Sequence, residues 1–136
     1  MAAALICVIS VAVFLQFFLS YCRSVLAVSR KVELSDRVRE VSGIAGRAIG
    51  AEDFSRLVQL VRLCPEQGDD ETEIRAVGAY YGLLRIVKHF SKILISRLGP
   101  WTERECQSCS HFAAVALDRR ISYSRDLFTQ QVADRT

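Results

Sequence analysis

Residues 2–22 read AAALICVISVAVFLQFFLSYC, and this stretch decides how the rest of the 136-residue chain is interpreted. It carries no formal charge, and Gln16 is its only strongly polar side chain. As a helix, about 21 residues cover roughly 31 Å, the thickness of the hydrocarbon core of a bilayer. A helix at the surface of a soluble core would carry a polar stripe, and this stretch carries none. The sequence therefore predicts a transmembrane helix.

A cleavable signal peptide is the alternative interpretation of the same stretch. Such a peptide needs a basic segment, a shorter apolar core and a small-residue cleavage site. The only charge before the apolar run is that of the α-amino group. A weak cleavage site is present at Val25-Leu26-Ala27, but Arg23 lies between it and the apolar run. A retained anchor is therefore favoured over a cleaved signal.

The orientation in the membrane follows from the charges that flank the apolar run. Arg23, Arg30 and Lys31 lie just after it, and no Lys or Arg precedes it. Because positive residues stay on the cytoplasmic side, the C-terminal part is expected to be cytoplasmic. We divide the chain into a transmembrane anchor with its basic juxtamembrane flank (1–31) and a cytoplasmic helical domain (32–136). The bilayer is the first expected partner.

Residues 32–50 show helical periodicity directly after the anchor. Their apolar positions are spaced four, three, four and three apart, which predicts one helix with an apolar seam and allows a short coiled coil. A helix of this kind would be loosened by glycine and would end near Gly50. The seam consists of Leu34, Val38, Val41, Ala45 and Ala48.

Three further helices are expected in the remainder of the chain. The first covers 51–64 and ends at Pro65, after which a polar loop follows. The second runs from about residue 72 to 98, and the third from about 101 to 120 with a continuation or restart toward the C-terminus.

Capping-box spacing marks the starts of the last two helices. Asp70 with Glu73 opens the earlier one, and Thr102 with Glu105 opens the later one. Because the connection around Gly99 is short, these two helices are expected to be antiparallel neighbours. The predicted fold is all-α, with an N-terminal transmembrane helix followed by a small bundle of about four helices containing an antiparallel helical hairpin.

The two helices of the hairpin are expected to pack large side chains against small ones. Ala114 lies about 100° away from Ala113 around its helix and is expected to be exposed. The packed residues are Val77, Tyr81, Leu84, Val87 and Leu94 on one helix and Cys109, Ala113, Ala116 and Leu117 on the other.

The stretch ERECQSCSH (103–111) is the one cluster that resembles a chemical site. Cys106 and Cys109 lie about 60° apart on the apolar face of the expected helix, whereas His111 is turned about 160° from Cys109. A zinc site needs four converging ligands, and a second pair is missing. A reactive cysteine gains a low pKa at a helix N-terminus, and Cys106 falls in the second turn. The two cysteines are therefore expected to pack, with no metal, no cofactor and no catalytic residue.

Recognition motifs for other chemistry are absent from the sequence. It contains no phosphate-binding loop, no nucleophile elbow and no H-E-x-x-H, so no small-molecule substrate is identified. The net charge of the chain is a modest +3, and basic residues cluster around Arg119, Arg120 and Arg125. Without interleaved aromatic residues, nucleic acid is not an expected partner.

One basic stripe could form an interaction face on the 72–98 helix. It could meet anionic lipid headgroups, although a solvated helix face is the ordinary explanation. The stripe consists of Arg85, Lys88, His89 and Lys92.

Taken together, these patterns favour a non-catalytic role for the chain. We expect an anchored interaction or scaffold element that binds a protein partner or associates with itself. The alternative is a thiol-dependent or metal-dependent enzyme that uses Cys106 and Cys109.

Overall fold

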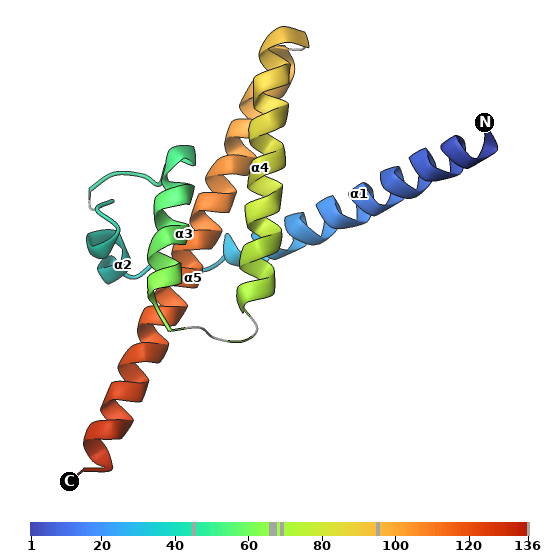
Figure 1. The fold of residues 1–136 in the computed structure, drawn as a ribbon. Helices are drawn as coiled ribbons and strands as arrows, with labels where there is room; N and C mark the ends of the chain where they lie inside the picture. Colours follow the sequence, from blue (N-terminus) through green and yellow to red (C-terminus); the bar gives the residue numbers. More distant parts are fainter. Residues whose placement is uncertain (45, 66–67, 69, 95, 136) are drawn as a thin grey trace.

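The computed structural model describes residues 1–136 except 45, 66–67, 69, 95 and 136, and the side chains of 91–96 also lie outside the description. Within the described part every regular element is a helix, which confirms the predicted all-α fold (Figure 1). The α-helices are α1 (Ala2–Ser29), α2 (Asp36–Val41), α3 (Phe54–Leu63), α4 (Asp70–Leu94) and α5 (Gly99–Ala133). Two short 3₁₀ helices, η1 (Ala51–Asp53) and η2 (Ser96–Leu98), lie immediately before α3 and α5.

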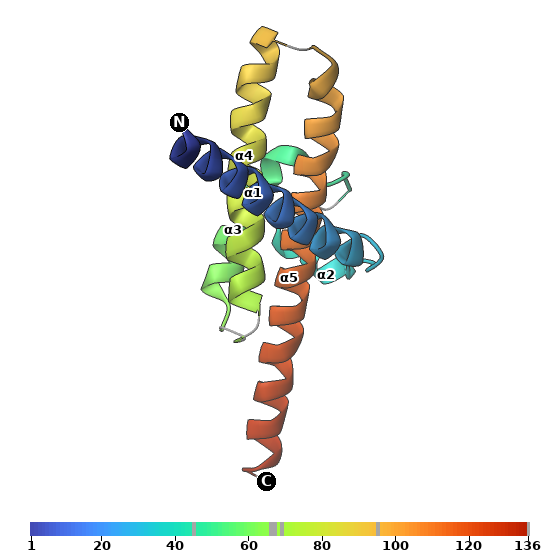
Figure 2. The ribbon, with the colours of Figure 1, turned by 90° about the vertical axis from the view of Figure 1, so that its right-hand side faces the viewer.

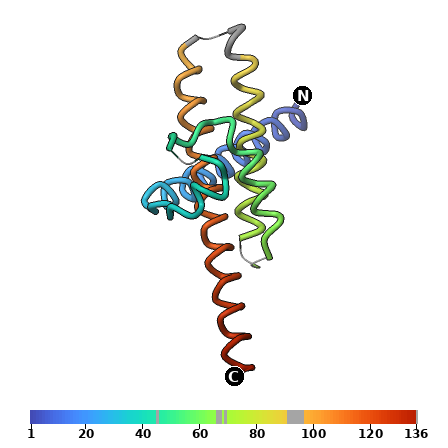
Figure 3. Tube along the Cα trace, turned by 90° about the vertical axis from the view of Figure 1, so that its left-hand side faces the viewer, coloured from blue at the N-terminus to red at the C-terminus, as the bar shows by residue number. Residues whose placement is uncertain are grey.

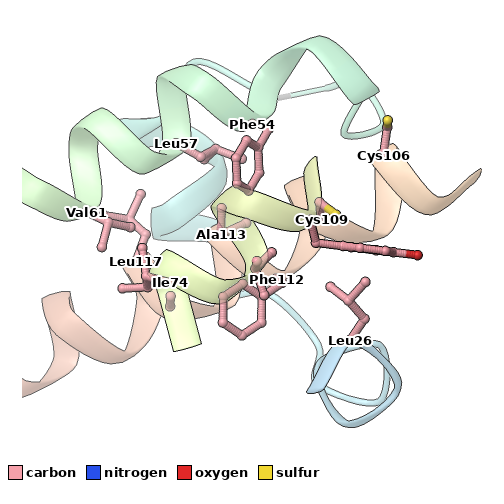
Figure 4. Packing of buried hydrophobic residues seen from close by; sticks show 14 of the residues in the cluster. Leu26, Phe54, Leu57, Val61, Ile74, Cys106, Cys109, Phe112, Ala113 and Leu117 are labelled. Atoms are coloured by element: carbon pink, nitrogen blue, oxygen red, sulfur yellow. The ribbon is translucent and has the colours of Figure 1, made fainter. Parts of the chain in front are cut away.

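Helix α1 is continuous over 28 residues and projects out of the bundle for most of its length (Figure 1). Its apolar part is long and hydrophobic enough to cross a membrane, and none of that part is buried against the rest of the chain. Its last two turns behave differently, because Cys22, Leu26 and Ser29 are buried. In Figure 4, Leu26 reaches into the same apolar cluster as Cys109 and Phe112 of α5.

Helix α5 is the central element of the bundle and contacts every other helix. Helices α1 and α4 cover one flank of α5, and α3 with the segment around α2 covers another (Figures 2 and 3). As a result, residues 112–117 are buried on all sides of the helix. Ala114 is only 1% exposed, so the expectation that it faces solvent is wrong. The reason is that α5 has several packing partners, whereas the expectation considered only one.

Helices α4 and α5 form the predicted antiparallel hairpin (Figure 2). Val77 and Leu84 are buried in it as expected, whereas Val87 is exposed and the side chain of Leu94 lies outside the described residues. Tyr81 turns toward α3 instead. Its ring stacks on Phe54 at 4.2 Å between centroids, and its hydroxyl donates a 2.9 Å hydrogen bond to the carbonyl of Ala51.

The single helix predicted over 32–50 is wrong, since only α2 forms there. Gly43 and Gly46 adopt positive φ values of 69° and 82°, a left-handed conformation that suits glycine and interrupts a helix. The chain then turns back onto α3, where the carboxylate of Asp53 accepts hydrogen bonds of 2.9 and 2.6 Å from Arg47. The amide of Gly50 donates a third, of 2.8 Å, to the same carboxylate. No coiled-coil seam can form along such an interrupted segment.

The capping boxes predicted for the last two helices are also wrong. Asp70 lies inside the first turn of α4. Helix α5 begins at Gly99, so Thr102 is already helical, and its hydroxyl donates back to the carbonyls of Leu98 and Gly99. Proline fits the first turn of a helix, which explains the earlier start. Glu105 is therefore free to bond elsewhere.

Candidate functional site

A buried polar cluster lies where α1, α4 and α5 meet. The hydroxyl of Tyr80 on α4 donates a 2.9 Å hydrogen bond to one carboxylate oxygen of Glu105 on α5. The guanidinium of Arg30, just after α1, approaches the other oxygen at 3.4 Å. The same guanidinium donates bonds of 3.0 and 2.6 Å to the hydroxyl of Ser108. One carboxylate thus ties together three segments that are far apart in the sequence.

Tyr80 and Glu105 of this cluster are buried, whereas the side chain of Arg30 is half exposed. Tyr80 is 1% exposed and Glu105 is 6% exposed, and the buried residues Cys22 and Leu26 belong to the same core. Burial raises the pKa of Tyr80 far above its ordinary value, and the carboxylate of Glu105 raises it further. The phenol therefore stays protonated and acts as a hydrogen-bond donor. This arrangement fixes α1 against the hairpin.

The cysteines of the 103–111 stretch lie in the core, as the apolar face of the helix predicted. Cys109 is fully buried and Cys106 is 3% exposed. Burial raises the pKa of both thiols, so they are protonated at neutral pH. The thiolate is the form that attacks substrates or binds metals, and these surroundings oppose its formation. Across the described ranges, no three His, Cys, Asp or Glu side chains are placed to hold a metal ion.

His111 is turned away from the two cysteines. It borders an open cleft of about 1050 Å³ between α5 and the segment that follows α1, together with Gln107 and Ser108. Burial lowers the pKa of His111, and the charge of Arg30 lowers it further, so its imidazole is neutral at pH 7. Its buried Nδ1 has no hydrogen-bond partner among the described residues. The structure thus separates the histidine from the cysteines in the way that helical periodicity predicts.

The three residues of the basic flank have different environments. Arg23 and Lys31 are exposed, whereas Arg30 is bound to Glu105 and Ser108 as described above. Their role at a membrane surface stays a prediction.

The stripe predicted on α4 is also divided. Arg85 and His89 are exposed, Lys88 forms an ion pair with Glu103 of α5, and the side chain of Lys92 lies outside the described residues. The interaction face assigned to these residues likewise stays a prediction.

Arg120 is a structural residue that the sequence interpretation missed. It is 1% exposed, so its placement in a surface cluster with Arg119 and Arg125 is wrong. One guanidinium nitrogen donates a 2.9 Å hydrogen bond to the carbonyl of Val61 near the end of α3, and the other lies 3.5 Å from the carboxylate of Glu71.

The signal for the buried polar residues was present in the helical spacing. Arg120 follows Ala113 by seven residues, and Glu105 precedes Cys109 by four, so each shares a face with a core residue. A charge on such a face needs a partner, and the partners come from distant helices that periodicity within one helix does not identify.

Comparison with other proteins gives no relative from which to transfer a function. No family model, curated protein or solved structure matches the chain significantly. The function is therefore argued from the geometry alone.

Proposed function

We propose that the chain is a single-pass membrane protein whose helical bundle serves as a non-catalytic, anchored interaction or scaffold element. In this proposal 1–31 form the anchor with its flank, and 32–136 form a domain on the cytoplasmic side. The observation that carries it is the split character of α1. Its apolar part has no protein partner in the described chain, whereas its last turns are built into the core.

The burial of the last turns of α1 supports retention of the anchor. Cleavage after Ala27 would remove Cys22 and Leu26 from the core and expose the apolar surface that they cover. Burying a leucine side chain stabilises a fold by about 1.5–3 kcal/mol. A chain that uses its N-terminal helix in this way folds best with the helix still attached.

An interaction role is supported by the C-terminal third of α5, which extends past the bundle (Figure 1). Phe128 and Val132 are well exposed there and lie four residues apart, on one side of the helix. Exposed apolar side chains at helical spacing suit a helical partner or a second copy of the chain.

Membrane integration and orientation can be tested together. We would express the chain with a reporter fused after Thr136 and extract the membranes at alkaline pH. The proposal expects the full-length chain to stay in the membrane pellet and the reporter to be on the cytoplasmic side. Release at alkaline pH, or a shortened N-terminus by mass spectrometry, would exclude the retained anchor. If a reporter that works only outside the cytoplasm is active after Thr136, the proposed orientation is wrong.

The interaction role has its own test. The intact protein would be purified in mild detergent together with any protein that co-purifies. The mass of the purified species would be measured by light scattering. Replacing Phe128 and Val132 by serine should remove the partner or the second copy. The control replaces Gln130, which is exposed on the opposite side of the helix, by serine and should change nothing. A lone monomer before and after both substitutions would exclude this surface.

A further inference from the structure

The hairpin has an exposed apolar face on the side from which α1 leaves the bundle. On α4, the carbonyl of Ala76 lies 3.7 Å from the thiol of Cys22, so Ala76 marks the side facing α1. Leu83 and Phe90 follow Ala76 at intervals of seven residues, or about two helical turns, and so point the same way. Phe90 is 57% exposed, and Ile86 between them is 55% exposed.

Two more residues extend this face. Val87 follows Tyr80 by seven residues and is exposed on the same side of α4. On α5, Trp101 precedes Ser108 by seven residues, and Ser108 binds Arg30. Trp101 is 40% exposed. We call Leu83, Ile86, Val87, Phe90 and Trp101 the hairpin face.

The continuity of α1 places this face close to the membrane. If residues 2–21 span the hydrocarbon, Cys22 enters the bundle one residue later, with no linker between. Leu26 lies five residues past the span, which is about 8 Å along the helix axis. The headgroup region on one side of a bilayer is of similar thickness, about 5–8 Å. The bundle therefore begins within the interfacial region of the bilayer.

The direction of α1 turns the hairpin face toward that region. Seen from the side on which α1 leaves, α1 crosses in front of α4 and α5 instead of running alongside them (Figure 2). Both helices continue past the crossing toward their connection (Figure 2). A helix that spans the bilayer thus holds the crossing helices along the membrane surface.

The composition of the hairpin face suits the interfacial region of a bilayer. It combines aliphatic and aromatic side chains with a tryptophan, which is enriched at membrane interfaces. Three exposed arginines, Arg23, Arg97 and Arg104, lie on α1, η2 and α5, and their cations attract anionic headgroups.

We propose that the hairpin face lies in the interfacial region of an anionic bilayer leaflet, so that the protein holds the membrane both by α1 and by the α4–α5 hairpin. This inference rests on the proposed membrane span of α1. It adds a second, peripheral contact near the end of the hairpin where α4 and α5 are connected, whereas the free end of α5 points away from the side on which α1 leaves (Figure 1).

Trp101 is the only tryptophan of the chain, and it reports on this contact directly. The full-length protein would be reconstituted into mixed vesicles of phosphatidylcholine and phosphatidylglycerol, with lipids brominated near the headgroup end of the acyl chain. We expect strong quenching of Trp101 by the brominated lipid and protection from aqueous iodide. Replacing Ile86 and Phe90 by serine should reduce the quenching and restore iodide access. The matched control replaces Val41 and Leu63, exposed apolar residues of α2 and α3, by serine and should leave both signals unchanged.

Insertion of α1 is measured separately in the same vesicles by resistance to alkaline extraction. If α1 is extracted, the proposed membrane span fails. If α1 stays inserted but iodide quenches Trp101 and the brominated lipid does not, the span stands and the hairpin contact is wrong. If neither agent quenches Trp101, protein covers it, and a second copy of the chain replaces lipid as the occupant of the face.

Discussion

Tyr80 of α4 donates a 2.9 Å hydrogen bond to the carboxylate of Glu105 on α5, and both side chains are almost completely removed from solvent. A buried carboxylate is costly unless its oxygens are bonded. Here one oxygen depends on Tyr80 and the other on a longer contact with Arg30. The pair therefore controls how α1, α4 and α5 fit together.

Removing the Tyr80 hydroxyl should destabilise the protein more than its loss of one hydrogen bond suggests. Tyr80→Phe leaves an oxygen of Glu105 buried without a donor, which should lower the free energy of unfolding by about 1–3 kcal/mol. The measurement is urea unfolding of the full chain in mild detergent, followed by circular dichroism. Tyr81→Phe is the control and should cost less, since the Ala51 carbonyl that its hydroxyl reaches also accepts a hydrogen bond from Ser110. Combining Tyr80→Phe with Glu105→Gln should cost less than the sum of the two changes, and full additivity would show that the residues are not coupled.

The central position of α5 predicts that two small residues about 100° apart around it are both intolerant of enlargement. Ala113→Phe and Ala114→Phe should each cost at least about 1–3 kcal/mol through overpacking. Gln130→Phe, on the exposed end of the same helix, should be tolerated. The same unfolding experiment compares the three variants. A large effect at Ala113 with none at Ala114 would mean that α5 has only one packed face.

The difference between Ala113 and Ala114 illustrates what the sequence could predict. Apolar periodicity predicted α1, α3, α4 and α5 and the burial of Cys106 and Cys109, because these depend on one helix at a time. The short connection around Gly99 predicted the hairpin. It could not identify how many neighbours α5 has, since that number depends on packing between segments distant in the sequence. Gly43 marks a similar limit: the apolar spacing of 32–50 fits a helix, yet local glycine conformations break it.

The packing of the two cysteines should be measurable in stability and not in bound metal. Replacing Cys106 and Cys109 together by alanine should cost about 1–3 kcal/mol, because small cavities open in the core. His111→Ala should be nearly silent, since the imidazole borders the open cleft. Metal analysis and thiol titration of the native protein complete the test. Stoichiometric zinc that disappears in the double variant would support the enzyme alternative instead.

Because of the contact between Asp53 and Arg47, the free energy of unfolding should fall at acidic pH. The hydrogen bonds from Arg47 hold the pKa of Asp53 below its ordinary value, and the Gly50 amide adds to this effect. Its stabilisation is therefore complete above the pKa of an unfolded aspartate, about 3.9, and is lost as the pH falls through the lower folded value. Asp53→Asn should weaken the protein at neutral pH, and its difference from the native chain should shrink below about pH 4. Asp126→Asn, at an exposed site, is the control. If the difference in the free energy of unfolding between Asp53→Asn and the native chain stays constant below about pH 4, Asp53 does not cause the loss of stability in acid.

The end of α1 should decide whether the bundle folds without its membrane segment. A fragment of residues 32–136 lacks Leu26 and Cys22, and it also lacks Arg30, so it exposes the apolar face around Cys109 and leaves Glu105 with one partner fewer. A fragment of 20–136 keeps all three residues and should be the more stable. The expected difference is at least about 1.5–3 kcal/mol, the contribution of one buried leucine. Urea unfolding of both fragments in detergent-free buffer measures the difference. Leu26→Ala in the longer fragment is the matched variant and should remove much of the advantage, because a fully buried leucine truncated to alanine costs about 2–5 kcal/mol. Equal stability of the two fragments would mean that α1 leaves the bundle before Cys22 and that the core is complete without it.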